Sequence, residues 1–183
     1  DIRKQLLEFD NVMNKQREVI YEQRDLVLES ENIREVILEM IKEVVESKVS
    51  LYAGKDAAAE EWDKEGLSQW LRSSFGIEAA DLMMKDITTT EELGSFIFSK
   101  VKEAYQAREK LIGTEALRQL EKAVTLHVTD VKWKDHLYAM DNLREGITLR
   151  AYGQRDPLVE YQHEAYEMFS QMIRNIKDET VEF

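Results

Sequence analysis

The chain contains no cysteine, only one proline and only seven glycines among 183 residues. Without cysteine it cannot form disulfide bonds or cysteine-based zinc sites, and this composition suits a cytoplasmic protein. Scarce proline and glycine leave few signals for the turns that join β-strands. Residues that favour helices, such as Glu, Leu, Lys, Ala, Met and Gln, are abundant instead. We therefore predict an all-α fold.

Long apolar runs are also lacking. No run approaches the roughly 18 residues that a membrane-spanning helix needs, and no signal-peptide pattern is visible. The hydrophobic fraction of 43% is nevertheless large enough to bury a core. The chain begins with Asp1 and not with methionine, so we expect it to be a piece of a longer protein.

The chain has no basic region of domain size. Its net charge is −12, and residues 1–48, 49–110 and 111–183 each contribute −4 (8 basic and 12 acidic, 8 and 12, 9 and 13). Nucleic-acid phosphates would be repelled by such a surface, so nucleic acid is not an expected partner. The exception is the stretch from Arg144 to Arg155, which holds three arginines and one glutamate.

Helical periodicity dominates the first part of the chain. Residues 1–53 contain no glycine or proline, and apolar residues recur at helical spacing, with a polar gap around Gln16, Gln23 and Ser30. We predict one long helix over residues 1–48, a spine whose segments face different neighbours. A coiled coil is the alternative, although the heptad pattern slips.

Residues 49–110 predict a small helical lobe, with a short helix at about Gly66–Ser74. A second helix follows a capping signal, Thr89 with Glu92 three residues later. In the last part, Thr114 is predicted as the N-cap of a long helix. Its apolar stripe is predicted to comprise Leu117, Leu120, Val124, Val128 and Val131, and to continue on a shifted face through Trp133, Leu137, Met140 and Ile147.

A break follows this long helix, and Asp156-Pro157 is predicted to start another helix as N-cap and first helical residue. A short connection makes the two helices antiparallel, which gives a hairpin with "LRAYGQRD" at its tip. Gly153 allows the reversal because glycine adopts positive φ readily. Tyr152 either faces solvent at this tip or folds back on the hairpin.

Motifs for independent catalysis are not found. Gly54-Lys55 is followed by Asp56 and lacks the upstream glycine of a phosphate-binding loop. There is no G-x-S-x-G motif, and the three histidines have no metal-binding spacing. We predict no catalytic residue, no bound metal and no cofactor in this chain.

Two long segments resemble one known family. "LLEFDNVMNKQREVIYEQR" (6–24) resembles the segment that opens the helical scaffold of the SecA preprotein translocase ATPases, and "VTDVKWKDHLYAMDNLREGITLRAYGQRDPLVEYQHEAYEMF" (128–169) resembles their two-helix finger. The resemblance implies that residues 1–48 form the long scaffold helix, 49–110 the helical wing and 111–183 the finger. ATP and Mg²⁺ would then bind motor domains that lie before this region.

The resemblance also implies roles for individual residues. The finger tip would contact the translocating polypeptide and the SecYEG channel through Arg150, Tyr152, Gly153 and Gln154. Finger packing and coupling to the motor would fall to Trp133, His136, Met140, Asp141 and Arg144.

The implied partners are SecYEG, preproteins, and the parent protein's own nucleotide-binding and preprotein cross-linking domains. The implied location is cytoplasmic and peripheral at the inner face of the bacterial plasma membrane, where an anionic surface is a further partner. Two other classes remain open: a free-standing coiled-coil interaction protein, and a helical enzyme with carboxylate–histidine chemistry.

Overall fold

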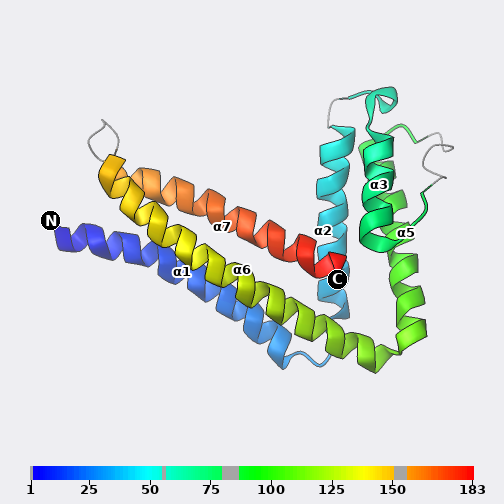
Figure 1. Ribbon diagram of the computed structural model, residues 1–183, viewed down its shortest axis with the longest axis horizontal. Coiled ribbons are helices and arrows are strands. Elements are labelled where there is room, and N and C mark those ends of the chain that lie inside the picture. Colours follow the sequence, from blue (N-terminus) through cyan, green and yellow to red (C-terminus); the bar gives the residue numbers. More distant parts are fainter. Residues whose placement is uncertain (1, 55–56, 80–86, 151–155) are drawn as a thin grey trace. The chain divides into compact units, whose positions relative to one another are not determined.

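The computed structural model of the chain describes residues 2–54, 57–79, 87–150 and 156–183, and only the backbone of 2–6 and 148–150. Within these ranges it contains helices and no strand (Figure 1). They are α1 (Ile2–Glu29), α2 (Arg34–Ala53), the 3-10 helix η1 (Ala59–Glu61), α3 (Lys64–Phe75), α5 (Thr90–Ile112), α6 (Thr114–Arg150) and α7 (Pro157–Glu182). The all-α prediction is confirmed.

The helices form two compact units. Unit 1 combines residues 1–31 with 122–176, and unit 2 combines residues 32–121 with 177–183. These units have different limits from the segments 1–48, 49–110 and 111–183, which follow the family's named parts and stay a prediction.

The single helix predicted over residues 1–48 is wrong, because the helix stops at Glu29 and restarts at Arg34. The side chain of Asn32 accepts a hydrogen bond from the backbone N–H of Arg34 (2.9 Å), so it satisfies a free donor at the start of α2. Ile33, the residue before α2, is completely buried. A Ser-Glu-Asn sequence at 30–32 is a loop signal, and it lies in the polar gap already visible in the sequence.

In unit 1, α1 lies antiparallel to α6 and parallel to α7. Asp10 and Arg24 of α1 pair with Arg144 and Asp130 of α6, so residue numbers rise along one helix as they fall along the other. Phe9 and Gln16 of α1 contact Tyr161 and Ala165 of α7, so residue numbers rise together along these two helices. Within unit 1, the antiparallel hairpin of α6 and α7 is therefore supported by a third helix (Figure 1).

Two apolar clusters form the core of unit 1. One contains Ile20, Val128, Trp133, Met172 and Ile176, and the other contains Met140, Leu143, Ile147, Tyr161 and Ala165. On α7 the buried residues Tyr161, Ala165, Met172 and Ile176 lie on one face of the helix. On α6 the prediction is partly wrong, since Leu120 and Val131 are exposed and the helix buries Thr125 and Thr129.

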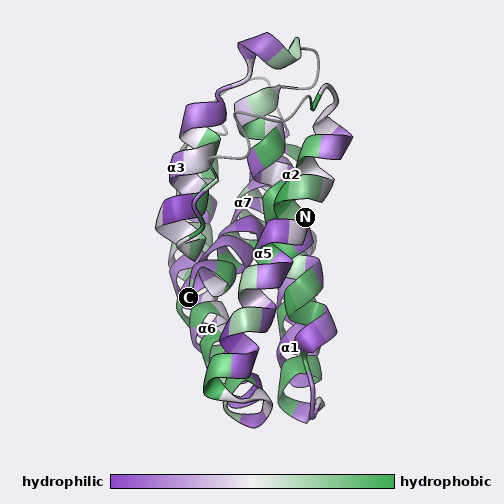
Figure 2. Cartoon of the chain, turned by 90° about the vertical axis from the view of Figure 1, so that its right-hand side faces the viewer, coloured by the Kyte–Doolittle hydropathy of each residue, from purple (hydrophilic) through white to green (hydrophobic). Residues whose placement is uncertain are grey.

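Unit 2 is built on α2, which packs against α5 and α3. Buried aliphatic residues come from α2 and α5, and two buried tryptophans, Trp62 and Trp70, come from the segment around α3. Hydrophobic and hydrophilic residues alternate along these helices (Figure 2), as expected where one face of each is buried.

The predicted helix starts are mostly correct. Thr89 accepts a hydrogen bond from the Glu92 N–H (3.2 Å), and α3 extends the predicted Gly66–Ser74 by one or two residues at each end. Thr114, however, is not an N-cap but the first residue of α6. Gly113 separates α5 from α6 with φ of 91°, a conformation that glycine adopts without strain.

Candidate functional site: the two-helix hairpin

The hairpin arms reach the predicted tip from both sides. Helix α6 has 37 residues and ends at Arg150, and α7 begins at Pro157. At about 1.5 Å per residue, α6 is about 55 Å long. The side chain of Arg150 and all of Tyr152, Gly153 and Gln154 lie outside the described residues, so their predicted role stays a prediction.

Asp156 caps the arm that leaves the tip. Its Oδ1 atom accepts a hydrogen bond from the Leu158 N–H (2.9 Å), and its carbonyl accepts one from the Glu160 N–H (3.2 Å). Pro157 occupies the first helical position, where its missing N–H costs nothing. This start confirms the prediction for Asp156-Pro157.

Close to the tip, α1 is joined to the hairpin by charge and by aromatic contact. Arg144 of α6 donates to Asp10 of α1 (3.0 Å), and its guanidinium lies 5.9 Å from the centre of the Phe9 ring. Phe9 in turn contacts Tyr161 of α7, with ring centres 4.6 Å apart. Burial raises the pKa of Tyr161, so its phenol stays neutral.

Halfway along the hairpin a buried polar network joins all three helices. Gln16 of α1 donates from Nε2 to the Ala165 carbonyl of α7 (3.1 Å), and its Oε1 lies 2.7 Å from Nε2 of His136 on α6. Because Gln16 Oε1 can only accept, His136 Nε2 is the donor. Burial lowers the pKa of His136, which favours the neutral ring.

At the base of the hairpin, α6 holds the end of α1. The Lys122 ammonium donates to the carbonyls of Leu28 (2.9 Å) and Ser30 (2.8 Å), which have no partner within the helix. Arg24 of α1 and Asp130 of α6 form an exposed ion pair (2.9 Å) that lies closer to the hairpin tip than Lys122 does.

The residues predicted for packing and coupling fall into two groups. Trp133, His136 and Met140 are buried in unit 1, while Asp141 is exposed and Arg144 is half exposed. Trp133 belongs to one apolar cluster and Met140 to the other. The structure therefore shows where Trp133, His136 and Met140 pack, whereas the coupling of these five residues to a motor stays a prediction.

Sequence reasoning missed the α1 side of this site. Phe9, Asp10 and Gln16 contact Tyr161, Arg144 and His136 respectively. A signal for Gln16 was present, because it is a polar residue at a position where the apolar stripe of α1 should continue.

Unit 2 holds a second buried polar cluster at the corner between α5 and α6. Arg118 donates to Glu121, to the Tyr105 hydroxyl (2.6 Å) and, at very short range, to Glu109. Tyr105 also donates to Glu121 (2.6 Å). Burial raises the pKa of Tyr105 to about 12 and raises the pKa of Glu121. The Arg118 guanidinium pairs with both carboxylates through its two terminal nitrogens, while its buried Nε makes no hydrogen bond to any residue that the structure describes, and we interpret the cluster as a structural one.

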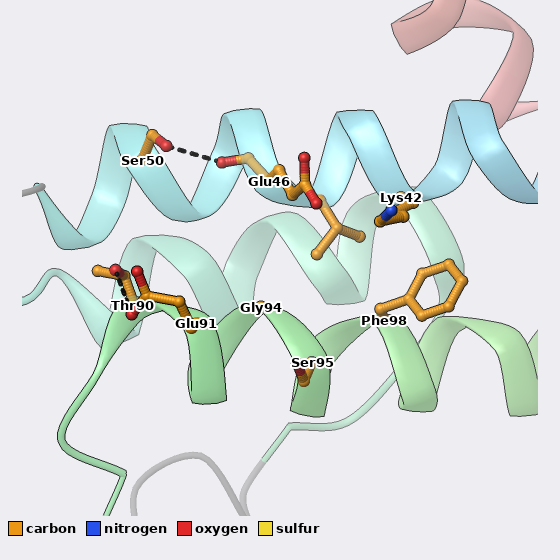
Figure 3. Close-up of a pocket in the computed structure, with 9 residues that line it drawn as sticks. Lys42, Glu46, Ser50, Thr90, Glu91, Gly94, Ser95 and Phe98 are labelled. Atoms are coloured by element: carbon orange, nitrogen blue, oxygen red, sulfur yellow. Dashed lines mark hydrogen bonds between the residues drawn. The ribbon is translucent and has the colours of Figure 1, made fainter.

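A groove of about 620 Å³ runs between α2 and α5 (Figure 3). Lys42 and Phe98 lie at one end of it, and Ser50 and Thr90 lie at the other. Its lining mixes single charges with small side chains, and nothing in it converges on one ligand chemistry.

Within the part of the chain that the structure describes, no three His, Asp or Glu side chains are grouped to hold a metal ion. Nor does any helix in those ranges combine the length and apolar character that crossing a bilayer requires.

The fold and the hairpin define a class: an all-α module in which a long antiparallel helix pair is supported by a third helix. A family model described as the SecA Wing and Scaffold domain matches residues 1–183. The chain belongs to this family.

Three relatives are each called "Protein translocase subunit SecA". The chain is 48% identical over 187 residues to the one from Pelotomaculum thermopropionicum, covering 100% of this chain and 21% of that protein. The relative from Caldicellulosiruptor saccharolyticus is 48% identical over 183 residues (99% and 21%), and the one from Heliobacterium modesticaldum is 44% identical over 185 residues (100% and 22%). The chain thus spans about a fifth of the length of the curated relatives it matches.

Proposed function

We propose that this chain is the scaffold, wing and finger part of a protein translocation motor. In that role it couples ATP hydrolysis in nucleotide-binding domains outside this sequence to movement of a preprotein through the SecYEG channel. The observation that carries the proposal is family membership over the whole chain, whose relatives are named as translocase subunits.

The hairpin is suited to transmit force. Its arms are long helices packed on α1 through two apolar clusters and a buried polar network. A connection between Arg150 and Pro157 leaves only a short segment to meet another molecule. Contact with many different preproteins must tolerate sequence variation, and a tyrosine offers apolar area with little loss of entropy.

In this proposal the tip residues Arg150, Tyr152, Gly153 and Gln154 contact the polypeptide or the channel. Trp133, His136, Met140, Asp141 and Arg144 hold the finger and couple it to the motor. ATP and Mg²⁺ bind the motor domains, and this chain holds no cofactor of its own.

Exposed apolar residues on α1 support packing by further parts of the parent protein. Leu7, Tyr21 and Leu28 are 63%, 50% and 45% exposed and are spaced by multiples of seven residues, so they form one line along the helix. The nucleotide-binding and preprotein cross-linking domains are the proposed partners of this line. The proposed location is the cytoplasm and the inner face of the plasma membrane, where anionic lipid is a further contact.

The same line favours a second candidate, a coiled-coil dimer formed through α1. Sedimentation of the 183-residue chain at micromolar concentration separates the two, since the coiled coil requires a stable dimer and the translocation role allows a monomer.

The direct test is Tyr152→Ala in a full-length SecA protein that carries this chain. We expect preprotein transport to fall at least tenfold while nucleotide affinity is unchanged, with Tyr152→Phe close to the parent. Normal transport by Tyr152→Ala would refute the role of the tip.

A further inference from the structure

The packing of unit 1 leaves the axial position of α1 only weakly specified by its apolar residues. Both clusters are rich in methionine: Met13, Met140, Met168 and Met172 line them. Methionine side chains are flexible and fill gaps of different shape. Such a core resists separation of the helices more strongly than it resists a small slide of one helix along another.

The exposed ion pairs do not supply the missing specificity. Arg24–Asp130 and Asp10–Arg144 each join a long, flexible arginine to an aspartate, and 37% to 54% of the surface of these four side chains is exposed. Pairs of this kind contribute little and can follow a displaced partner.

Gln16 differs from these pairs in burial and in geometry. It is 7% exposed, it lies where the two apolar clusters meet, and it uses both ends of its amide at once. One end binds the α7 backbone and the other binds a buried side chain of α6. A slide of α1 by one helical turn, about 5.4 Å, would break both hydrogen bonds and leave buried polar groups without partners.

We propose that Gln16 is the positioning residue that fixes the register of α1 against both arms of the hairpin. With His136 and the Ala165 carbonyl it forms a lock, and the hairpin then moves together with α1. The lock itself concerns the packing of unit 1, while its consequence for transport rests on the proposed function above.

The test uses Gln16→Met, which keeps the length of the side chain and removes both hydrogen bonds. His136→Gln is the conservative variant, because its amide nitrogen can replace the ring Nε2 as donor. Arg24→Met is the matched control, since it removes an exposed contact between the same two helices. Cysteines for spin labels are introduced at Glu22 and Tyr138, which are exposed and offset along the helix axes, in a chain that otherwise has none.

Pulsed electron–electron resonance on the 183-residue chain then reports the distance between α1 and α6. We expect Gln16→Met to broaden or shift the distance distribution, while His136→Gln and Arg24→Met keep the parent's single narrow peak. A Gln16→Met distribution that superimposes on the parent's, with only a lower Tm, would overturn the lock and leave Gln16 an ordinary core residue.

Transport assays in a full-length SecA protein separate failure of the lock from failure of the proposed function. If the lock matters for transport, we expect Gln16→Met to transport less preprotein per ATP hydrolysed than the parent. We expect His136→Gln, which keeps a donor for Gln16, to retain most of the parent's ratio. A changed register with normal transport by both Gln16→Met and Tyr152→Ala would refute the proposed function and keep the lock. Normal register in Gln16→Met, with impaired transport by Tyr152→Ala, would refute the lock alone.

Discussion

At the scale of single residues, unit 1 depends on a histidine that is buried without charge. His136 is 5% exposed and contacts the rings of Trp133 and Phe169, at 5.6 and 5.7 Å between centres. Charging this ring would place a cation among apolar groups, which is why burial lowers its pKa.

This lowered pKa makes stability depend on pH. Near and below pH 6.5 the unfolded chain binds a proton that the folded chain resists, so the free energy of unfolding falls as the pH drops toward the folded pKa. The contribution is fully present above pH 6.5. Urea unfolding between pH 8 and pH 5 should show a steeper loss for the parent than for His136→Gln. Equal losses in the two proteins would show that His136 does not titrate on unfolding.

A second residue-scale prediction concerns Arg118 at the corner between α5 and α6. It is 5% exposed and serves two carboxylates and the Tyr105 hydroxyl. Arg118→Leu removes the guanidinium that pairs with the buried Glu121 carboxylate and with Glu109, and we expect a loss of about 3–5 kcal/mol in the free energy of unfolding. Arg72→Leu, which removes an exposed ion pair, should cost less than about 1 kcal/mol. Equal costs in denaturant titrations would contradict a structural role for the cluster.

At the scale of elements, helix ends are set by a few side chains. Asp156 caps α7 next to the hairpin tip, so Asp156→Ala should destabilise the chain by about 1 kcal/mol, and Asp156→Asn by less. Amide hydrogen exchange should speed up in the first turn of α7 and stay unchanged in α5. Unchanged exchange at Leu158 would show that the cap is not formed in solution.

Lys122 gives a corresponding prediction for the end of α1. Lys122→Met removes the donor for the Leu28 and Ser30 carbonyls, and we expect a loss of about 1 kcal/mol with faster exchange in the last turn of α1. Lys134→Met, at an exposed position on the same helix, serves as the control for a general loss of positive charge on α6. An identical effect of both substitutions would contradict specific capping.

Helix starts that depend on local capping residues were predicted from the sequence better than helix interruptions and buried faces were. Asp156-Pro157 and Thr89 carry local capping chemistry, and the structure confirms both. The interruption at Ser30–Ile33 has a local signal in Ser30–Asn32, but it is also held by burial of Ile33 and by a lysine about 90 residues away, and no local pattern reveals these two contributions. Likewise the stripe of α6 was misplaced at Leu120 and Val131, because threonine is not counted as apolar and Thr125 and Thr129 are buried.

Prediction of the site met the same limit. Burial of Trp133 and Met140 followed from periodicity, since both lie on the apolar face of α6. The pairing of His136 with Gln16 joins residues 120 positions apart and depends on how three helices pack. Tyr152, Gly153 and Gln154 remain predictions from resemblance.

At the scale of the whole molecule, the proposed function makes the chain one part of a larger motor. It spans about a fifth of its relatives, and α1 exposes a line of apolar residues. We expect the 183-residue chain to sediment as a monomer at micromolar concentration and to hydrolyse no ATP above the buffer rate. A stable dimer would favour the coiled-coil candidate, and measurable hydrolysis would contradict the division of labour proposed here.

Contact between the finger tip and a moving polypeptide is the central claim, and crosslinking tests it most directly. A photoreactive amino acid replaces Tyr152 in a full-length SecA protein that carries this chain, and a second variant carries it at Tyr166, an exposed position on α7. During ATP-driven transport we expect crosslinks to the preprotein from position 152 and few from position 166. Crosslinks from position 152 confined to its own chain, or no more frequent than those from position 166, would contradict the account.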